Sequence, residues 1–297
     1  VYLGMAKEKY DVGQNIEADN LTKKAKDLFD QVIVKNQDNI EANNALALYW
    51  LLRTEHETDE ANRLEYLNRA EDFIENVLAV KPTNVVALNT RGLIYMQRGE
   101  YTIAKWVFEN KVLKLDKGST EAHNNLGITL LDMGKLDEAV ASYQKALSIN
   151  PDYAKAHSNL AIALNKLGRM NEAVASYQRA LTIKPDFAEA HNGLGNTLGD
   201  LGKLEDAIIC YRNVLALKPD FAETHNNLGT ALKDLGQFDE AVSCFKKALF
   251  LKPDFIKAQS NLILSLNYIG EDSPADVLGE THRFGTMVAP LAPGLEE

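Results

Sequence analysis

Apolar and small residues return along much of this chain with the spacing of amphipathic helices. With the recurring loop prolines as a register, 34-residue repeats run from residue 119 to 254 and start at Thr120, Ala154, Ala188 and Ala222. Positions 4, 7, 8 and 11 of each repeat fall on one arc of a helix at about 100° per residue. A second stripe carries Ala at position 20 and an aromatic residue at position 24. Each repeat is therefore predicted to form two amphipathic helices.

Small residues stand where the two helices of a repeat would meet. Position 8 is Gly or Ala and position 20 is always Ala, which lets the helices approach closely. The aromatic residues at position 24 are Tyr143, Tyr177, Tyr211 and Phe245.

Two kinds of loop separate the predicted helices. A glycine, as in "DMGKLDEA" and "DLGQFDEA", is placed to end the first helix in a left-handed conformation. The second loop reads "KPDFAE" at residues 184–189 and again at 218–223. Pro cannot continue a helix, so we expect the second helix to stop there. We also expect the Asp to cap the next helix and the following aromatic residue to pack between repeats.

This pattern resembles the tetratricopeptide repeat, whose signature places W-x2-L-G-x2-Y, then A-x3-F, then P within 34 residues. The departures are His at the Trp position and Leu at the first Tyr position, and both keep a mid-sized packing group. The resemblance implies an all-α, right-handed superhelical solenoid of antiparallel helix pairs. Stacking is required because one helical hairpin cannot bury its own apolar face.

The repeats are regular only in the middle of the chain. Residues 1–118 are predicted to form irregular hairpins, with one extra residue before Thr120 and a polar insertion, "RTEHETDEANR". Four regular repeats fill 119–254, a partial repeat and a junction helix fill 255–288, and 289–297 is expected to be a disordered tail.

Charge and cysteine content narrow the class of partner. The net charge of −10 and the pI of about 5.2 disfavour nucleic acid, because an acidic surface repels phosphates. Two cysteines give no disulfide framework and favour a reducing, cytoplasmic location. No apolar run approaches the ~18 residues of a membrane span.

The candidate reactive residues all occupy packing positions. His123, His157, His191 and His225 stand at position 4, and successive copies are expected about 10 Å apart, too far to share one zinc ion. Cys210 and Cys244 take a position that is Ser in the two preceding repeats. We therefore predict no catalytic residue, no metal and no cofactor.

One row of polar residues on the first helices is not explained by folding alone. Positions 2, 6, 9 and 13 of the first helix point away from the packing arc, and position 6 is Asn although Asn is a mediocre helix former. Amides match the backbone of an extended peptide, so a protein or peptide partner is predicted in a concave groove. The alternative is simple copying within a repeat. The predicted peptide-binding residues are Asn125, Asn159, Asn227, Asn261, Asp132, Asp200 and Asp234, with Gly193 a gap in the first row and Lys166 breaking the second.

The end of the chain resembles the junction in bacterial proteins of the protein O-GlcNAc transferase type. The matching residues are Ser260, Asn261, Leu262, Leu266, Asn267, Tyr268, His282, Arg283, Phe284 and Gly285. In that family the Asn row holds the substrate peptide by its main chain, just before a glycosyltransferase domain. The resemblance implies a substrate-recruiting arm without its catalytic domain, and therefore no enzyme activity in this chain. A scaffold that assembles other proteins, or that self-associates, is the alternative.

Overall fold

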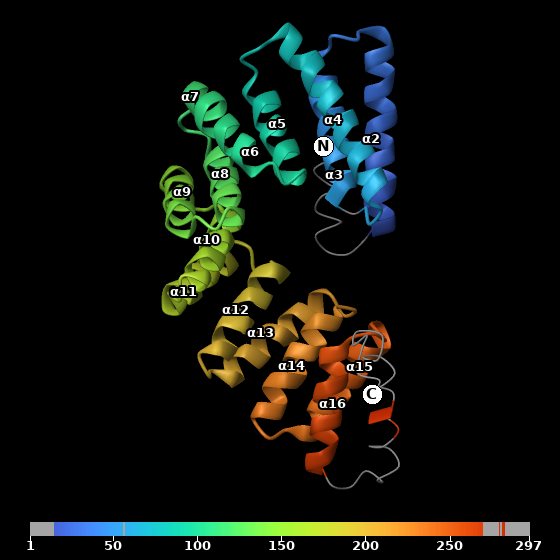
Figure 1. Ribbon diagram of the computed structural model, residues 1–297, viewed down its shortest axis with the longest axis vertical. Coiled ribbons are helices and arrows are strands. Elements are labelled where there is room, and N and C mark those ends of the chain that lie inside the picture. The colour runs from blue at the N-terminus through green and yellow to red at the C-terminus, as the bar shows by residue number, and fades with distance from the viewer. Residues whose placement is uncertain (1–14, 56, 270–278, 280, 283–297) are drawn as a thin grey trace, which may run out of the picture. The chain divides into compact units, whose positions relative to one another are not determined.

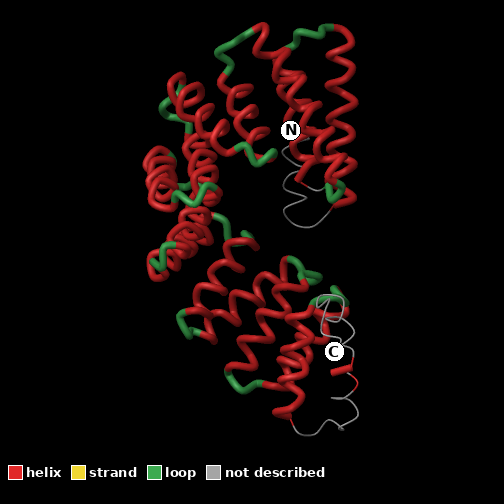
Figure 2. The backbone as a smooth tube through the Cα atoms, viewed as in Figure 1, coloured by secondary structure: helices red, strands yellow, loops and turns green. Residues whose placement is uncertain are grey.

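The structure is a computed structural model that describes residues 15–55, 57–269, 279 and 281–282, and these residues form helices joined by short loops (Figures 1 and 2). The chain divides into two compact units, Val1–Leu167 and Gly168–Glu297. Within each unit, helices that follow one another in the chain pack as antiparallel pairs, such as α8 with α9 and α14 with α15. The predicted all-α fold of stacked helix pairs is confirmed.

The helix boundaries follow the repeat pattern, because the first helices of the four regular repeats, α8, α10, α12 and α14, begin at the predicted residues. The first unit contains α2 (Asn15–Lys35), α3 (Ile40–Glu55), α4 (Glu60–Val80), α5 (Val85–Gln97), α6 (Tyr101–Val107), the π-helical turn η1 (Phe108–Val112), α7 (Leu113–Leu115), α8 (Thr120–Asp132), α9 (Leu136–Ile149) and α10 (Ala154–Lys166). The second unit contains α11 (Met170–Ile183), α12 (Ala188–Asp200), α13 (Leu204–Leu217), α14 (Ala222–Asp234), α15 (Phe238–Leu251) and α16 (Ile256–Ile269).

The predicted glycine caps are present. Gly134 has φ 73°, and the backbone N–H groups of Gly134 and Lys135 donate to the carbonyls of Leu131 and Leu130 at 3.0 and 2.8 Å. These bonds satisfy carbonyls that the end of α8 would otherwise leave unpaired. The same positive φ recurs at Gly99, Gly168, Gly202 and Gly236.

The prediction that Asp caps the first helices is wrong. The N-cap residues of α10, α12 and α14 are Tyr153, Phe187 and Phe221, one position after the Asp, and no side chain caps these helices. An aromatic side chain has no acceptor for the orphan N–H groups, so these helix starts lack the bond that Ser119 supplies to α8. The aromatic residues also differ in packing, since Phe187 is 9% exposed and Phe221 is 37% exposed.

The extra residue before Thr120 is absorbed inside a helix rather than in a loop. The end of the second helix of this hairpin forms the π-helical turn η1, and a π-helical turn accommodates one additional residue per turn. Phe108 and Val112 of this turn are fully buried, so the insertion leaves the core-facing positions in register.

In the three regular repeats with Gly at position 8, the core is built on the contact between positions 8 and 24. A Cβ placed on Gly127, Gly195 or Gly229 would lie 2.5, 2.8 or 2.7 Å from the ring of Tyr143, Tyr211 or Phe245. Such distances are far below a van der Waals contact, so the ring lies directly on the Cα of the glycine. The predicted need for a small residue at position 8 is therefore explained by the aromatic ring at position 24.

Two glycines of α12 should respond oppositely to the same substitution. Gly195→Ala should lower the free energy of unfolding by about 1–3 kcal/mol, because the new methyl group overlaps the Tyr211 ring. Gly199→Ala should raise it by up to about 1 kcal/mol, since only Tyr211 Oη lies within 4 Å, at 3.8 Å, and Ala favours the helix. Urea unfolding followed by circular dichroism measures both changes. Equal effects at the two positions would contradict this account of the packing.

Candidate functional site

The candidate site is a surface on the first helices of the repeats, which we call the amide face and define as positions 6, 9 and 13 of those helices. Position 9 is polar at Asn196 and Thr230 but apolar at Ile128 and Ile162. The asparagines at position 6 are half-buried, and Asp132, Asp200 and Asp234 at position 13 are exposed. The structure thus places the predicted residues on the surface, but it also gives the asparagines a second task. Each one bonds to the neighbouring repeat.

In the first unit these bonds link successive first helices directly. Asn125 Nδ2 donates to Asn89 Oδ1 of α5 at 3.2 Å, and Asn159 Nδ2 donates to Asn124 Oδ1 of α8 at 3.0 Å. Asn124 is only 4% exposed, so its carbonyl oxygen would lose a needed partner without Asn159.

The second unit shows the same linkage with one change of partner. Asn261 Nδ2 donates to Asn226 Oδ1 at 3.2 Å and to Thr230 Oγ1 at 3.3 Å. Asn227 Nδ2 donates to Asn196 Oδ1 at 3.2 Å, one helical turn further along α12. Asn196 Oδ1 also accepts from Tyr211 Oη at 2.9 Å.

Position 5 holds acceptors that the periodicity of the sequence did not reveal. Asn124 and Asn226 accept these bonds and are buried, as is Ser158, although position 5 borders the predicted packing arc. A polar residue that returns at the edge of an apolar stripe was the signal that could have found this row.

Part of the amide face is hollowed into a pocket of about 460 Å³ in the second unit. The pocket brings together the predicted residues Asp200, Asn227 and Asp234, which lie on the two successive first helices α12 and α14. It is completed by Asn196, Gly199, Leu204, Tyr211, Thr230 and Ala231. Carboxylate, amide and hydroxyl groups thus converge over a small apolar floor. Asn125, Asn159 and Asn261 do not line this pocket.

The gap in the Asn row has a packing cause. A Cβ on Gly193 would lie 2.5 Å from both Cζ and Oη of Tyr177, so no larger side chain fits while that ring holds its place. Burial raises the pKa of Tyr177 to about 12. The tyrosine hydroxyl therefore stays protonated at neutral pH and occupies the place where the other repeats carry an amide.

The acidic row differs in environment from one member to the next. Burial raises the pKa of the Asp132 carboxyl above its usual value, and Lys166 opposes that rise. Asp234 lies 3.5 Å from the ammonium group of Lys233, whereas Asp200 forms no ion pair with any described residue. Burial and the neighbouring Asp200 raise the pKa of Tyr211, so its hydroxyl remains a hydrogen-bond donor.

The four histidines at position 4 have a structural partner. Their Nε2 atoms lie 2.8–3.1 Å from the backbone carbonyl oxygens of Lys117, Pro151, Pro185 and Pro219, each six residues earlier. Each imidazole therefore ties the loop before a first helix to that helix. Among the described residues, no group of three or more His, Cys, Asp or Glu side chains could hold a metal ion.

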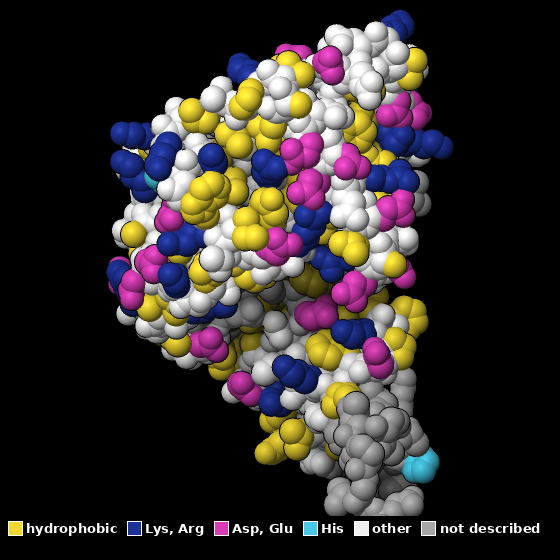
Figure 3. Space-filling view, turned by 45° about the horizontal axis from the view of Figure 1, so that its top comes forward, with side chains coloured by type: hydrophobic (Ala, Val, Ile, Leu, Met, Phe, Trp, Pro, Cys, Tyr) yellow, Lys and Arg dark blue, Asp and Glu magenta, His cyan; other side chains and the backbone are white. Residues whose placement is uncertain are grey.

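The distribution of surface charge and the apolar character of the helices bear on the kind of partner that the chain can bind. On the face seen in Figure 3, basic and acidic side chains are interspersed, with apolar side chains between them and no continuous basic stripe. Across residues 15–55 and 57–269, none of the helices has the length and apolar character to cross a membrane.

Stacked helical hairpins with a polar face define an α-helical repeat protein, and the sequence comparisons identify the repeat. Residues 129–168, 163–202 and 195–236 match the family described as TPR repeat, and residues 222–255 match tetratricopeptide repeat. Residues 129–255 of the chain therefore carry tetratricopeptide repeats. No curated protein matches the chain.

Several solved structures share this fold. MamA is 30% identical over 55% of this chain and 94% of its own, with a TM-score of 0.51. YrrB, described as a TPR protein with an unusual peptide-binding site, is 21% identical over 62% of this chain and 95% of its own, with a TM-score of 0.52. The APC/C hetero-tetramer Cut9–Hcn1 supplies a chain that covers 98% of this one over 53% of its own length, with 17% identity and a TM-score of 0.68.

Two tyrosines at position 24 should differ in what their hydroxyl groups contribute. Tyr143 Oη is buried without a hydrogen-bond partner, so Tyr143→Phe should leave the free energy of unfolding unchanged or raise it by about 1 kcal/mol. Tyr211→Phe removes the bond to Asn196 and should lower it by about 0.5–1.5 kcal/mol. Phe245 shows that the position accepts Phe. Thermal melts of the two variants measure both changes. A larger loss of stability for Tyr143→Phe than for Tyr211→Phe would contradict the roles given to the two hydroxyl groups.

The two thiols should be nearly inert in the folded protein. Burial is the main cause that raises the pKa of both Cys210 and Cys244 to about 11. At pH 7.5 their thiolate fraction should be about two orders of magnitude below that of a free cysteine with a pKa of about 8.5. Alkylation by iodoacetamide, followed by mass spectrometry, should be slow in buffer and fast in urea. Rapid labelling of either thiol at pH 7.5 in the folded protein would contradict this environment.

Proposed function

We propose that this tetratricopeptide-repeat chain is a protein-interaction module that holds an extended peptide segment on its amide face. The observation that carries the proposal is the pocket that gathers Asp200, Asn227 and Asp234 from two neighbouring first helices. Asp200 comes from α12, whereas Asn227 and Asp234 share α14, and the sequence predicts that all three meet the same ligand. YrrB, a structural neighbour, is described as having a peptide-binding site.

Two amides outside the pocket, those of Asn125 and Asn159, retain the fullest capacity for a ligand after their bonds to the neighbouring repeat, whereas Asn227 Oδ1 in the pocket already accepts from Asn226 Nδ2 at 3.3 Å. An Asn side chain offers two N–H donors and a carbonyl oxygen. Within the described part of the chain, Asn125 and Asn159 each donate to one neighbouring side chain, and their Oδ1 atoms accept no bond. A second N–H and an acceptor therefore remain, which are the two groups that complement a peptide bond.

The expected binding is weak and tolerant of peptide sequence. Each hydrogen bond to the peptide contributes about 0.5–1.5 kcal/mol net, so four asparagines give about 2–6 kcal/mol. Micromolar affinity requires about 8 kcal/mol. Weak capture is useful where a linked active site gains from the raised local concentration of its substrate.

We further propose that this chain is the substrate-recruiting arm of an O-GlcNAc transferase-like enzyme. The supporting resemblance lies in α16, which carries Asn261, Leu266, Asn267 and Tyr268, and in the following junction. His282 is described and exposed, whereas Arg283, Phe284 and Gly285 lie outside the described residues. The chain itself is proposed to have no transferase activity, and a cytoplasmic, bacterial setting belongs to the same proposal. The competing function is a scaffold that assembles other proteins or copies of itself.

The test combines a change in the protein with a change in the peptide. Asn227→Ala removes a pocket amide while Asn196 Oδ1 keeps its bond from Tyr211, so the fold should survive. Together with Asp200→Asn and Asp234→Asn, it should weaken binding of a fluorescein-labelled Gly/Ser/Thr peptide at least about fivefold, since each lost bond is worth about 0.5–1.5 kcal/mol. Fluorescence anisotropy measures the dissociation constants.

The controls separate main-chain recognition from other modes of binding. Asn213→Ala changes an exposed asparagine of α13 outside the pocket and should leave binding unchanged. The same peptide with N-methylated backbone nitrogens should not bind the wild-type chain. Equal binding of the methylated peptide, or no effect of the triple variant, would reject the amide face as the site. Sedimentation of the wild-type chain as a concentration-dependent oligomer would favour the scaffold.

A further inference from the structure

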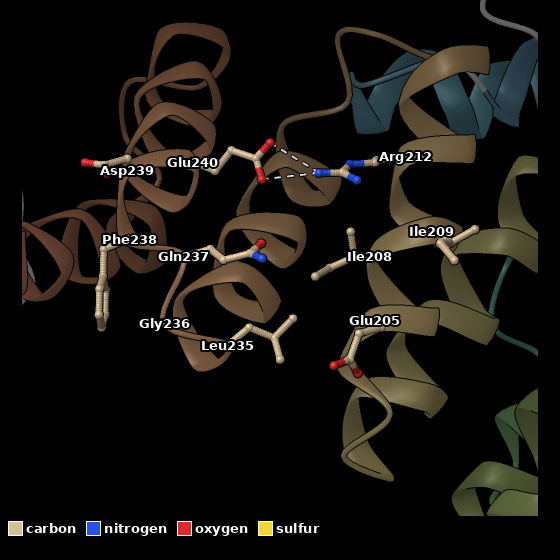
Figure 4. A pocket seen from close by; sticks show the side chains of 10 residues that line it. All are labelled: Glu205, Ile208, Ile209, Arg212, Leu235, Gly236, Gln237, Phe238, Asp239 and Glu240. Carbon is tan, nitrogen blue, oxygen red and sulfur yellow. Dashed lines mark hydrogen bonds and ion pairs between the residues drawn. The ribbon is translucent and has the colours of Figure 1, made fainter.

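A second hollow lies on a different surface of the second unit. We call it the α13 notch and define it by the ten residues labelled in Figure 4, four from α13 and six from the α14–α15 turn and the start of α15. Its volume is about 610 Å³, and none of its residues lines the pocket of the amide face. Figure 4 shows Ile208 reaching from α13 toward Leu235 and Gln237, with the Arg212–Glu240 pair at one end and Glu205 at the other.

The residues of the notch depart from the pattern of the other repeats. Position 22 is Ile209 here, whereas the other regular repeats have Ala141, Ala175 and Ser243. Position 16 is Gln237, whereas the three preceding repeats have a basic residue, Lys135, Arg169 or Lys203. Copying within a repeat would reproduce the small and basic residues. Both departures fall in the α13 notch. Ile209 makes the notch more apolar, and Gln237 makes it less positively charged.

The apolar part of the notch is only partly covered. Ile208 is 6% exposed and forms the floor, but Ile209 beside it is 57% exposed. An exposed β-branched side chain on a helix surface is less favourable to the helix than Ala. Burying Ile209 under a partner side chain would be favourable.

The rim of the notch is acidic. Glu205, Asp239 and Glu240 face a single cation, Arg212. Arg212 is already engaged, because one of its terminal nitrogens lies 3.2 Å from both carboxylate oxygens of Glu240. Glu205 and Asp239 make no ion pair with the described residues, so the rim presents uncompensated negative charge around the exposed isoleucine.

We propose that the α13 notch docks a segment of a partner protein that presents an aliphatic side chain flanked by Lys or Arg. The aliphatic side chain covers Ile208 and Ile209, and the flanking cations meet Glu205 and Asp239. Charge complementarity selects this partner over an acidic segment. The site is independent of peptide capture on the amide face, so one chain can hold two different segments.

The experiment uses three labelled peptides of equal length. One carries Leu-Leu between two lysines, one carries Leu-Leu between two glutamates, and one carries Ser-Ser between two lysines. By fluorescence anisotropy, the first should bind the wild-type chain at least about fivefold more tightly than either of the others, because only it satisfies both the apolar floor and the acidic rim. Methyl NMR signals of Ile208 and Ile209 should shift when it binds.

Two variants complete the test on surface positions that leave the core untouched. Ile209→Ala with Gln237→Lys restores the residue types of the other repeats and should reduce binding of the first peptide to that of the serine peptide. Ala175→Ile with Lys203→Gln and Asn171→Glu builds the same apolar and acidic features in the preceding repeat and should add a second site. Asn227→Ala should leave all three affinities unchanged, which separates this site from the amide face.

Several outcomes would overturn the proposal. They are equal binding of the lysine and glutamate peptides, wild-type affinity in the Ile209→Ala, Gln237→Lys variant, or shifts confined to residues of the amide face. Should that variant fail to fold, the methyl shifts of the wild-type chain decide alone. Wild-type dimers in sedimentation that the Ile209→Ala, Gln237→Lys variant abolishes would instead make the notch an interface between two copies.

Discussion

The repeat architecture depends on one close contact, in which the aromatic ring at position 24 lies on the bare Cα of position 8. Glycine there lets the two helices of a pair approach until the ring fills the space between them, as Tyr211 does on Gly195. The distance between the helices then sets where every other position faces. In the repeat whose position 8 is Ala161, the ring of Tyr177 lies on Gly193 at position 6 of the next repeat. The interruption of the amide row is therefore a consequence of packing and carries no information about a ligand.

The asparagines of the amide face have two roles that the sequence cannot separate. Their N–H groups bond to acceptors in the neighbouring repeat, and the acceptors of Asn159 and Asn261, which are Asn124 and Asn226, are buried. At these two positions the structural role alone explains a mediocre helix former at position 6, since an unpaired buried amide would cost about 1–3 kcal/mol. The presence of Asn is therefore not by itself a sign of peptide binding. The pocket in which Asn227 meets two carboxylates from different helices is the feature that supports it.

Periodicity predicted the helix pairs, the glycine caps and the residues that start the first helices, because each of these is fixed by local steric rules that repeat with the sequence. It failed where the outcome depends on a partner in another repeat or on a single added residue. The Asp of "KPDFAE" looks like a helix cap, but the helix begins one residue later, at an aromatic N-cap. The extra residue before Thr120 gave no sign that a buried π-helical turn would absorb it. The hydrogen bonds between Asn side chains join residues more than thirty positions apart in the sequence. From the sequence alone, position 5 looks like an edge of the core, because its partners lie in another repeat.

Duplication explains why the two candidate surfaces should behave differently. The amide face carries Asn at position 6 and Asp at position 13 in most of the regular repeats, so these groups recur at a regular spacing and suit the equally regular backbone of an extended peptide. Such a surface gains affinity by length rather than by selecting side chains. The α13 notch arises where one repeat abandons the copied residues, and Ile209 with Gln237 gives that repeat a surface the others lack. A repeat protein can in this way combine a tolerant surface with a selective one, because substitutions at exposed positions of a single repeat leave the contact between positions 8 and 24 intact.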